Sequence, residues 1–399
     1  MASLLTVEEA HELVLQRARP LPAEVVPIVE AGGRVTADDI RARVDLPPFA
    51  SSAMDGFAVR SADPPGTLRV VGESAAGRPF VAPVEPGLAV AISTGAVVPE
   101  GADAVVPVER VVRQDNSVQI SHSVEPGAHV RPRGGDVGAG EVVVPGGVRL
   151  TPPRLAAAAA SGVAELACVR RPRVAVLPTG SELVEPGEAL RPGQIYETNS
   201  LMLCSALAGF GAEVVDEPSV ADDEEVLREA LGRGLAADVL VTSGGVSVGE
   251  HDLVRAVERE LGVEEVFWRV SMKPGKPVSF GVRGDTLVFG LPGNPVSALV
   301  GCELFVKPAL RALLGLADPL PRFEPGKLAV AMRRNEERDE FVRARSAVDG
   351  DTIVLEPIIG QESHMIVRAA AADALIHVPR GNGELPAGTT VRWLRLGGV

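Results

Sequence analysis

Two of the four lysines in this 399-residue chain stand three residues apart, in the segment MKPGKPVSF at 272–280. Prolines and a glycine restrict the backbone of this segment, so that the ammonium groups of Lys273 and Lys276 can point into one space. Two ammonium groups in one space attract a compact oxyanion. Taken alone, the segment is also consistent with a surface turn that carries two solvated lysines.

Four further polar segments each follow an expected strand. They read LPTGSEL (177–183), SVADD (219–223), VTSGGVSVGEHD (241–252) and GLPGNPVS (290–297). Because parallel strands place ligands at their carboxyl ends, we expect all five loops to form a pocket at one edge of a sheet. Glycine N–H groups and hydroxyls suit an anion there, and nearby carboxylates suggest Mg²⁺. Taken singly, each segment is equally consistent with a turn or a helix cap.

The elements that would position these loops alternate between strand and helix over residues 172–316. This alternation predicts a parallel sheet with helices on both faces. Short valine-rich runs between turn residues predict a β-rich region from 44 to 150, and residues 322–399 return to that pattern. A helix is expected over residues 3–19, with Thr6 and Glu9 forming a capping box.

The β-rich region carries polar clusters of its own. They are SSAMDGFAV (51–59), ISTGAVVPEGAD (92–103) and RPRGGDVGAG (131–140). Each cluster could be an ordinary turn. Together, Asp55, Thr94 and Asp136 suggest a second face of the pocket.

The composition excludes several kinds of protein. A net charge of −14 argues against nucleic acid and anionic membranes as partners, because no positive field attracts phosphates. Cys168, Cys204 and Cys302 lie far apart without a CxxC pair, so we expect buried free thiols and no zinc or disulfide framework. The N-terminus follows an acidic amphipathic pattern rather than a signal peptide, and no 18-residue apolar run occurs. We therefore expect a cytoplasmic protein.

Together the motifs resemble one family. The segments SSAMDGFAV, TGAVVPEGADAVV, RPRGGD, TGSEL, YETNS, TSGGVSVGEHD, KPGKP, LPGNPVS and QESH follow the order found in MoeA proteins. MoeA proteins are molybdopterin molybdenumtransferases, and they are similar to the E domain of gephyrin and to its plant counterpart. The likeness runs over residues 3–399, and so many motifs in one order are highly specific.

The resemblance implies a multidomain fold of the α/β plus β class. It has a MogA-like three-layer α/β domain with a parallel sheet, a β-rich N-terminal region with flanking helices, and a C-terminal β-barrel domain. The implied ranges are 1–43 with 138–170 (helical linking domain), 44–137 (β-rich domain), 171–318 (α/β molybdopterin-binding domain) and 319–399 (barrel).

The resemblance also implies an activity. The family inserts molybdenum from molybdate into adenylylated molybdopterin, with Mg²⁺-dependent release of AMP, and so forms the molybdenum cofactor. The implied assembly is a homodimer whose active site is shared between subunits, with transient contacts to a MogA-type adenylyltransferase and to molybdoenzyme chaperones. Two alternatives remain open: a MogA-type adenylyltransferase, against which the long N-terminal region counts, and a non-catalytic dimeric scaffold like the gephyrin E domain.

Residue by residue, the resemblance implies the following roles. Lys273 and Lys276 would hold molybdate or the phosphates. Molybdate would also contact Ser297, Ser363 and Arg343, for which Arg345 is the alternative. Mg²⁺, its water or the pterin would be handled by Glu182, Asp222 and Asp252. A partner subunit would contribute its own copies of Asp55, Thr94 and Asp136. The remaining cofactor-binding residues would be Thr179, Gly180, Ser243, Gly244, Gly245, Pro292 and Pro295.

The chain departs from the family pattern at three positions. Glu362 stands where glycine is common, and Pro132 and Gly135 stand where bacterial members often carry arginine and glutamate. A carboxylate at position 362 would either point away from the proposed anion site or weaken its affinity for molybdate.

Overall fold

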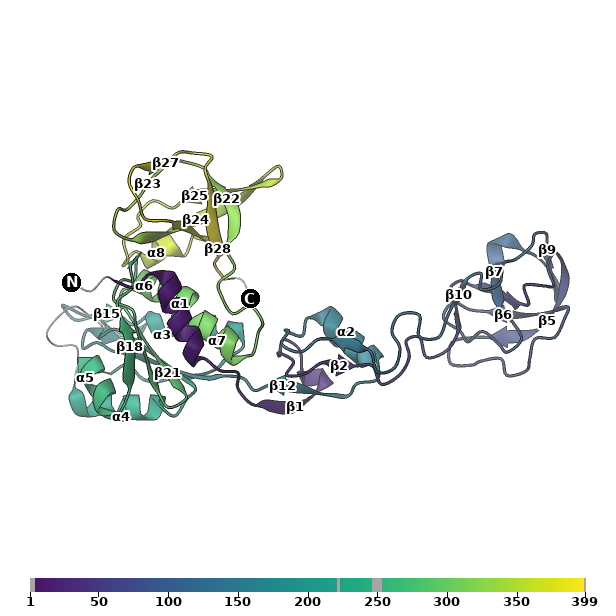
Figure 1. Cartoon of the computed structure of the whole chain (residues 1–399), viewed down its shortest axis with the longest axis horizontal. Helices are drawn as coiled ribbons and strands as arrows, with labels where there is room; N and C mark the ends of the chain where they lie inside the picture. The colour runs from purple at the N-terminus through teal and green to yellow at the C-terminus, as the bar shows by residue number, and fades with distance from the viewer. Residues whose placement is uncertain (1–3, 221–222, 246–252, 398–399) are drawn as a thin grey trace. The chain divides into compact units, whose positions relative to one another are not determined.

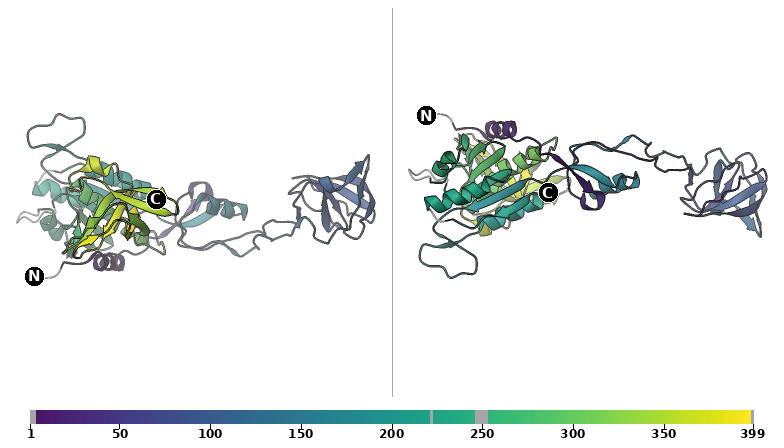
Figure 2. Two further views of the ribbon diagram at one scale, coloured as in Figure 1. Left: turned by 90° about the horizontal axis from the view of Figure 1, so that it is seen from above. Right: turned by 90° about the horizontal axis from the view of Figure 1, so that it is seen from below.

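The computed structural model describes residues 4–220, 223–245 and 253–397. The chain divides into two compact units, one formed by Met1–Glu24 with Val169–Val399 and the other by Val25–Cys168. In Figure 1 and Figure 2 the second unit runs from purple through blue to teal, and the first unit from teal through green to yellow, with its N-terminal helix in purple. The first unit contains the sheet whose strand ends carry the polar loops.

The α/β domain of the first unit is built on a six-stranded sheet with the order β16-β13-β17-β21-β20-β18. Its strands are β13 (Arg173–Pro178), β16 (Glu213–Asp216), β17 (Val239–Ser243), β18 (Glu264–Trp268), β20 (Ser279–Arg283) and β21 (Thr286–Leu291). The strands from β16 to β21 in this order are parallel, which confirms the predicted parallel sheet for that part. β20 and β18 are antiparallel to their neighbours. Only Gly284 and Asp285 join β20 to β21, and a parallel pair would need a long crossover.

Helices cover both faces of this sheet, as the alternating pattern predicts (Figure 1). On one face lie α4 (Glu224–Gly234) and α5 (Leu253–Glu260), whose apolar side chains form one core with residues of β13 and β17. On the other face α3 (Asn199–Phe210) lies along β13 and β16 and contacts α6 (Pro295–Gly301). A sheet covered on both faces needs strands that are buried and largely apolar, as the central strands are, with the buried Thr242 and Ser243 at the carboxyl end of β17.

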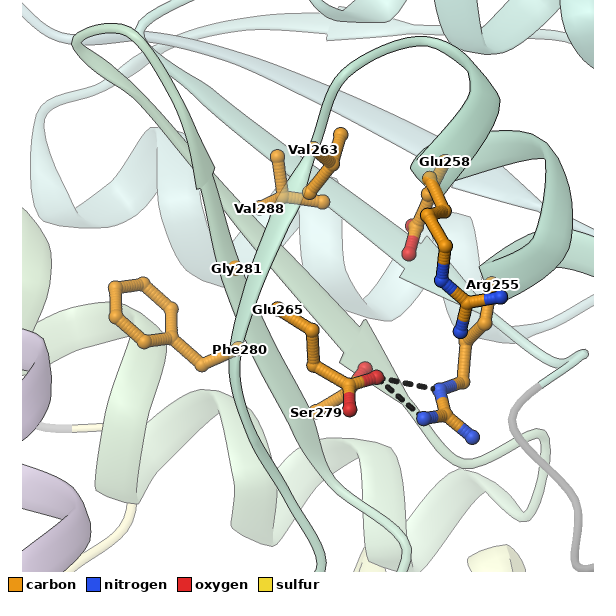
Figure 3. A pocket seen from close by; sticks show the side chains of 9 residues that line it. Arg255, Glu258, Val263, Glu265, Ser279, Phe280, Gly281 and Val288 are labelled. Carbon is orange, nitrogen blue, oxygen red and sulfur yellow. Dashed lines mark hydrogen bonds and ion pairs between the residues drawn. The ribbon is translucent and has the colours of Figure 1, made fainter.

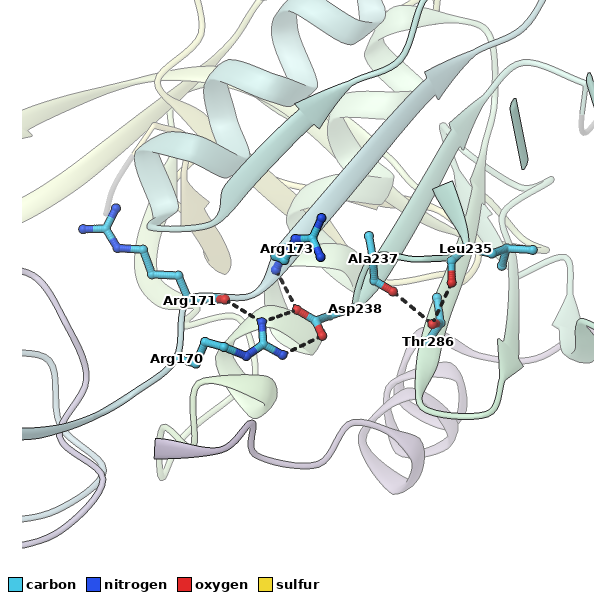
Figure 4. Close-up of polar contacts among 7 residues, drawn as sticks. All are labelled: Arg170, Arg171, Arg173, Leu235, Ala237, Asp238 and Thr286. Carbon is cyan, nitrogen blue, oxygen red and sulfur yellow. Dashed lines mark hydrogen bonds and ion pairs between the residues drawn. The ribbon is translucent and has the colours of Figure 1, made fainter. Parts of the chain in front are cut away.

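The amino ends of β13 and β17 are held by one carboxylate, Asp238 (Figure 4). Its two oxygens accept hydrogen bonds from the guanidinium of Arg170, each at 2.8 Å, and Oδ2 also accepts from the Arg173 N–H at 2.7 Å. Burial raises the pKa of Asp238, but these hydrogen bonds outweigh it and hold that pKa below its ordinary value. The clamp therefore fixes the end of the strands opposite the polar loops.

The edge strand β18 packs against α5 (Figure 3). Nε of Arg255 donates to Glu265 at 2.8 Å. The guanidinium groups of Arg255 and Arg269 both lie over the Trp268 ring, at 4.0 and 3.6 Å from its centre. The hollow between helix and strand measures about 20 Å³, which is room for about one water and not for a substrate.

The C-terminal part of the first unit is a closed five-stranded barrel, which confirms the predicted β-barrel. The ring runs β24-β25-β22-β28-β26 and returns to β24. Its strands are β22 (Glu324–Leu328), β24 (Asp339–Asp349), β25 (Thr352–Pro357), β26 (Ala374–Val378) and β28 (Thr390–Arg395). A short strand, β19 (Met272–Lys273), adds in parallel to the start of β24. The lysine segment is therefore attached to the barrel.

The second unit contains the predicted β-rich region. Its sheet has the order β7-β4-β6-β5-β9-β8. The strands are β4 (Gly56–Val59), β5 (Gly66–Ser74), β6 (Leu88–Ile92), β7 (Ala104–Pro107), β8 (Val112–Gln114) and β9 (Ser117–Ile120). Alternate residues of β4 enter separate cores, Phe57 and Val59 one core and Ala58 the other, as the period of a strand requires. A smaller cluster joins α2 (Pro152–Ala160) to β2 (Ile40–Arg41) and β11 (Val142–Val144).

The N-terminal helix α1 (Val7–Arg17) begins at the predicted capping box. Thr6 Oγ1 accepts from the Glu9 N–H at 3.1 Å, and the Glu9 carboxylate accepts from the Thr6 N–H at 2.8 Å. Further along, Nε2 of His11 donates to the Leu304 carbonyl at 2.6 Å. Leu304 lies in a π-helical turn, Cys302–Val306, between α6 and α7 (Lys307–Leu313). A π turn shifts the usual helical hydrogen bonds, and His11 supplies a donor to one of its carbonyls.

The three cysteines are free thiols, as expected. Cys168 and Cys302 are buried, whereas Cys204 is half-buried. Burial raises the pKa of the Cys302 thiol to about 12, which makes it a poor nucleophile. No helix in the described ranges is long and apolar enough to cross a membrane.

The buried His11 predicts a pH-dependent stability. Burial lowers the pKa of His11 below its ordinary value of 6.5, although its hydrogen bond to Leu304 opposes the shift. Above pH 6.5 the imidazole is neutral in both the folded and the unfolded state. As the pH falls below 6.5, the unfolded state takes up a proton first, so the free energy of unfolding decreases.

The variant His11→Gln keeps an amide donor for the Leu304 carbonyl but does not titrate. We expect its free energy of unfolding, measured by urea denaturation, to match that of the wild type near about pH 8 and to exceed it increasingly below about pH 6. A constant difference between the two proteins across this range would contradict the assignment.

Candidate functional site

The loops after β13, β17 and β21 line a hollow of about 720 Å³ at the carboxyl ends of these strands. We call it the strand-end pocket. Its lining includes eight residues predicted from the sequence, namely Thr179, Gly180, Glu182, Ser243, Gly244, Gly245, Pro292 and Pro295, the last at the start of α6. The sequence therefore identified the main wall of this pocket from the polar segments that follow the strands.

The glycines of the β17 loop allow neighbouring loops to interlock. Gly244 has φ +102°, and a Cβ there would lie 2.2 Å from the Thr179 carbonyl oxygen. Gly245 has φ +64°, and a Cβ there would lie 2.2 Å from a methyl group of Val254. Only glycine fits both positions, because left-handed backbone and close approach each exclude a side chain. The backbone of this loop is thereby brought to the pocket.

A second wall was not assigned to the site by the sequence. It comes from the segment before α3 and includes Glu197 and Asn199. The Asn199 amide nitrogen donates to Ser243 Oγ and to the Gly293 carbonyl, both at 2.8 Å, and so joins the β17 loop to the β21 loop. The sequence signal for this wall was YETNS, one of the family motifs, although no role was assigned to its residues.

Residues of the lysine segment line two different hollows. Nζ of Lys273 lies 2.8 Å from Glu340 Oε1, and Lys273 lines a separate hollow of about 300 Å³ against the barrel. Pro277, one residue after Lys276, lines the strand-end pocket. Lys276 itself is half-buried, and its ammonium forms no hydrogen bond or ion pair with the residues described here. The structure thus pairs Lys273 with a barrel carboxylate, which the sequence did not predict.

Two segments that are remote in sequence meet beside the lysine segment. The Val296 N–H donates to the Ser363 carbonyl at 3.1 Å, which joins the start of α6 to the QESH segment. A Cβ on Gly275 would lie 3.6 Å from the Ser297 carbonyl oxygen, so the lysine loop touches the same helix. The predicted residues Ser297 and Ser363 are therefore brought together with the loop between the lysines.

Arg343 lies in β24 and is only 1% exposed. Its guanidinium donates to the carbonyls of Gly360 and Met365, both at 2.9 Å, and of Glu362 at 3.2 Å. Burial lowers the pKa of Arg343 below its ordinary value. Arg343 thus holds the segment that carries Ser363, while the Glu362 side chain, the departure from the family pattern, is exposed.

The carboxylates predicted to hold Mg²⁺ are described only in part. Glu182 is exposed at the pocket, where its Oε2 would lie 2.6 Å from a Cβ on Gly180. Asp222 and Asp252 lie outside the described residues. Within the described ranges, no group of three or more His, Cys, Asp or Glu side chains is arranged to hold a metal. Of the three predicted carboxylates, Glu182 is the one that the described residues place at the pocket. One carboxylate there would fit Mg²⁺, because that ion commonly takes one or two carboxylates and otherwise water and phosphate.

The second unit holds the remaining predicted residues. Asp55 Oδ1 accepts from the Thr94 N–H at 2.7 Å, so these two exposed residues lie together. Asp136 is also exposed, and its N–H donates to the Leu46 carbonyl at 2.8 Å. The predicted carboxylates Asp55 and Asp136 are therefore both exposed on this unit, and Asp55 is fixed by the backbone of Thr94.

Comparisons with known proteins cover nearly the whole chain. Residues 5–162 match the MoeA N-terminal region (domain I and II), residues 175–312 a probable molybdopterin binding domain, and residues 325–396 the MoeA C-terminal region (domain IV). The chain is 38% identical to molybdopterin molybdenumtransferase 2 of Mycobacterium tuberculosis, covering 97% of this chain and 98% of that protein. It is 36% identical to the molybdopterin molybdenumtransferase of Haemophilus influenzae, with the same coverage.

A solved structure agrees with these relatives. The molybdopterin biosynthesis MoeA protein from Pyrococcus horikoshii is 33% identical and superposes with a TM-score of 0.85, covering 100% of each chain. Family models, relatives and structure thus confirm the resemblance inferred from the motifs. The chain belongs to the MoeA family, whose named relatives are molybdopterin molybdenumtransferases.

Proposed function

We propose that this protein inserts molybdenum from molybdate into adenylylated molybdopterin and releases AMP in a Mg²⁺-dependent step. The observation that carries the proposal is the meeting of the lysine loop, the start of α6 and the QESH segment beside the strand-end pocket. An oxyanion site next to a phosphate pocket gives the two reactants proximity, which is a large part of catalysis in a transfer between bound groups. The transferase activity named for the relatives is consistent with this arrangement.

The strand-end pocket is the proposed site of the pterin phosphate and of AMP. Backbone N–H groups of the glycine loops and the hydroxyls of Thr179 and Ser243 would bind phosphate oxygens. Glu182, together with the predicted ligands Asp222 and Asp252, would hold Mg²⁺ or orient the attacking water. A bound Mg²⁺ would neutralise charge that develops on the leaving phosphate.

The proposed molybdate site lies where Ser297, Ser363 and the lysine loop meet. Lys276 would supply charge directly. The Lys273 side chain is 54% exposed, so its ion pair with Glu340 is weak and can exchange for a dianion. Arg343 would support this site through the carbonyls that it binds, and direct contact with molybdate would require it to leave them.

The assembly is proposed to be a homodimer, with Asp55 of the partner subunit and Thr94 of the partner subunit completing the pocket. Exposed polar groups on the second unit support this idea, since they have no catalytic partner within that unit. A MogA-type adenylyltransferase would supply the adenylylated pterin, and molybdoenzyme chaperones would receive the cofactor. The proposed location is the cytoplasm, where free thiols such as those of this chain persist.

The activity is tested by incubating the protein with adenylylated molybdopterin, molybdate and MgCl₂. We expect stoichiometric AMP, measured by chromatography, and loss of its release when EDTA replaces MgCl₂. A characterised molybdopterin molybdenumtransferase serves as the positive control. If that control releases AMP and this protein does not, the proposed activity is wrong.

The role of Lys276 is tested by Lys276→Ala, with Lys327→Ala in the exposed part of β22 as the matched control. Loss of one charge-assisted contact costs about 1.5–3 kcal/mol, so the Kd for molybdate should rise about tenfold or more, while the control keeps the wild-type value. Calorimetric titration with molybdate measures both constants. Equal affinity of the two variants would exclude Lys276 from the anion site.

The ion pair of Lys273 makes a separate prediction. In Glu340→Gln the ammonium is released from its carboxylate, so molybdate should bind several-fold more tightly than to the wild type, and Lys273→Ala should abolish this gain. The same titration measures the effect in the single and double variants. Tighter binding by Glu340→Gln that persists without Lys273 would point to another cation.

A further inference from the structure

Asn199 occupies a defined orientation in the wall of the strand-end pocket. It is 7% exposed, and its amide nitrogen contacts both Ser243 Oγ and the Gly293 carbonyl oxygen. A carbonyl oxygen only accepts hydrogen bonds, so the amide atom that faces Gly293 must be the nitrogen. The two possible orientations of the amide are therefore distinguished by chemistry.

The backbone of Asn199 is fixed as well. The buried carboxylate of Glu197 accepts from the N–H of Asn199 at 2.7 Å and from the N–H of Ser200 at 2.9 Å, which caps the start of α3. The Glu197 N–H in turn donates to the Val184 carbonyl at 2.8 Å, close to Glu182 in the chain. Asn199 therefore joins the β17 and β21 loops from a helix start that Glu197 caps and ties to Val184.

The Asn199 contact determines what the Ser243 hydroxyl can do. Ser243 is 2% exposed and lines the pocket. Its oxygen accepts from Asn199, and its O–H donates to no acceptor among the described residues. A hydroxyl whose oxygen already accepts one bond still carries a hydrogen that needs an acceptor. Because Ser243 lines the pocket, a ligand bound there can supply that acceptor.

The Asn199 amide oxygen argues against a purely structural role. This oxygen is buried and has no hydrogen-bond partner in the described part of the chain. A buried acceptor without a partner lowers stability and calls for an explanation. The nitrogen contacts to the β17 and β21 loops provide one, because they give the pocket its geometry.

We propose that Asn199 is a positioning residue that joins the β17 and β21 loops and turns the Ser243 O–H toward an anionic oxygen of the bound substrate. The oxygen belongs to a phosphate group, since the pocket is lined by glycine loops and hydroxyls. This inference rests on the proposed function for the identity of the substrate. Asn199 itself does not touch the reacting atoms.

The variant Asn199→Asp tests the hydroxyl's direction. A carboxylate cannot donate to Gly293, and it would accept the Ser243 O–H, which turns that hydrogen away from the pocket. The added charge also repels phosphate, so its effect is measured separately in a Ser243→Ala background. AMP is the probe, and its Kd is measured by calorimetry for the wild type, both single variants and the double variant.

We expect Asn199→Asp to weaken AMP binding about tenfold more in the wild-type background than in the Ser243→Ala background, which is the coupling of about one charge-assisted hydrogen bond. Asn382→Asp, in an exposed barrel loop, is the matched control and should bind AMP like the wild type. Equal weakening in both backgrounds, or no AMP binding by the wild type, would overturn the inference. If Asn199→Asp fails to fold by circular dichroism, Asn199→Ala replaces it in the same cycle.

The AMP-binding result is independent of turnover. Coupling between the two residues without AMP release from the adenylylated pterin would leave the positioning role intact and reject the proposed reaction. Normal AMP release without coupling between the two residues would reject the positioning role and support the proposed reaction.

Discussion

Parallel pairing of β13, β17 and β21 is the constraint on which the rest of the site depends. Parallel strands must all end on the same side, so the three following loops have to share one edge of the sheet. The Asp238 clamp fixes the other end and leaves this edge free for polar groups. Apolar strands thus provide the energy of folding, while the loops that they align carry the chemistry.

The loops then stabilise one another through contacts that only particular residues permit. Gly244 and Gly245 let the β17 loop approach Thr179 and Val254 without a side chain between them. Asn199 adds hydrogen bonds across the gap between the β17 and β21 loops. The pocket is therefore shaped on one side by close approach of the β17 loop to its neighbours, and on the other side by the side-chain amide of Asn199.

The barrel contributes to the site by supporting it. β19 extends β24 in parallel, and Arg343 of β24 binds the carbonyls of the segment that contains Ser363. Both contacts come from the same long strand of the barrel. The lysine loop and the QESH segment are consequently held at fixed positions relative to each other, although about 85 residues separate them in sequence.

Local patterns in the sequence predicted the helices and strands. They did not predict contacts between segments that are remote in the sequence. Short-range rules predict the Thr6 capping box, the helices that alternate with strands, and the polar loops that follow the strands. The ion pair of Lys273 with Glu340 depends on the register of two strands that no periodicity encodes. Likewise, the buried position of Arg343 and the bridge made by Asn199 arise from tertiary packing, and the antiparallel edge arises from a two-residue turn. The domain ranges and the roles of the site residues stay predictions.

The strand β19 has a consequence for how such a protein can change. Residues 272–273 pair with the barrel, yet residues 279–283 form β20 of the central sheet, so one short stretch of backbone serves both. An insertion or deletion in that stretch would alter both the lysine loop and the pairing of β19 with the barrel strand β24. Recombination between relatives should therefore preserve the α/β domain and the barrel as a matched pair, because exchanging either one alone would disturb the backbone that both share.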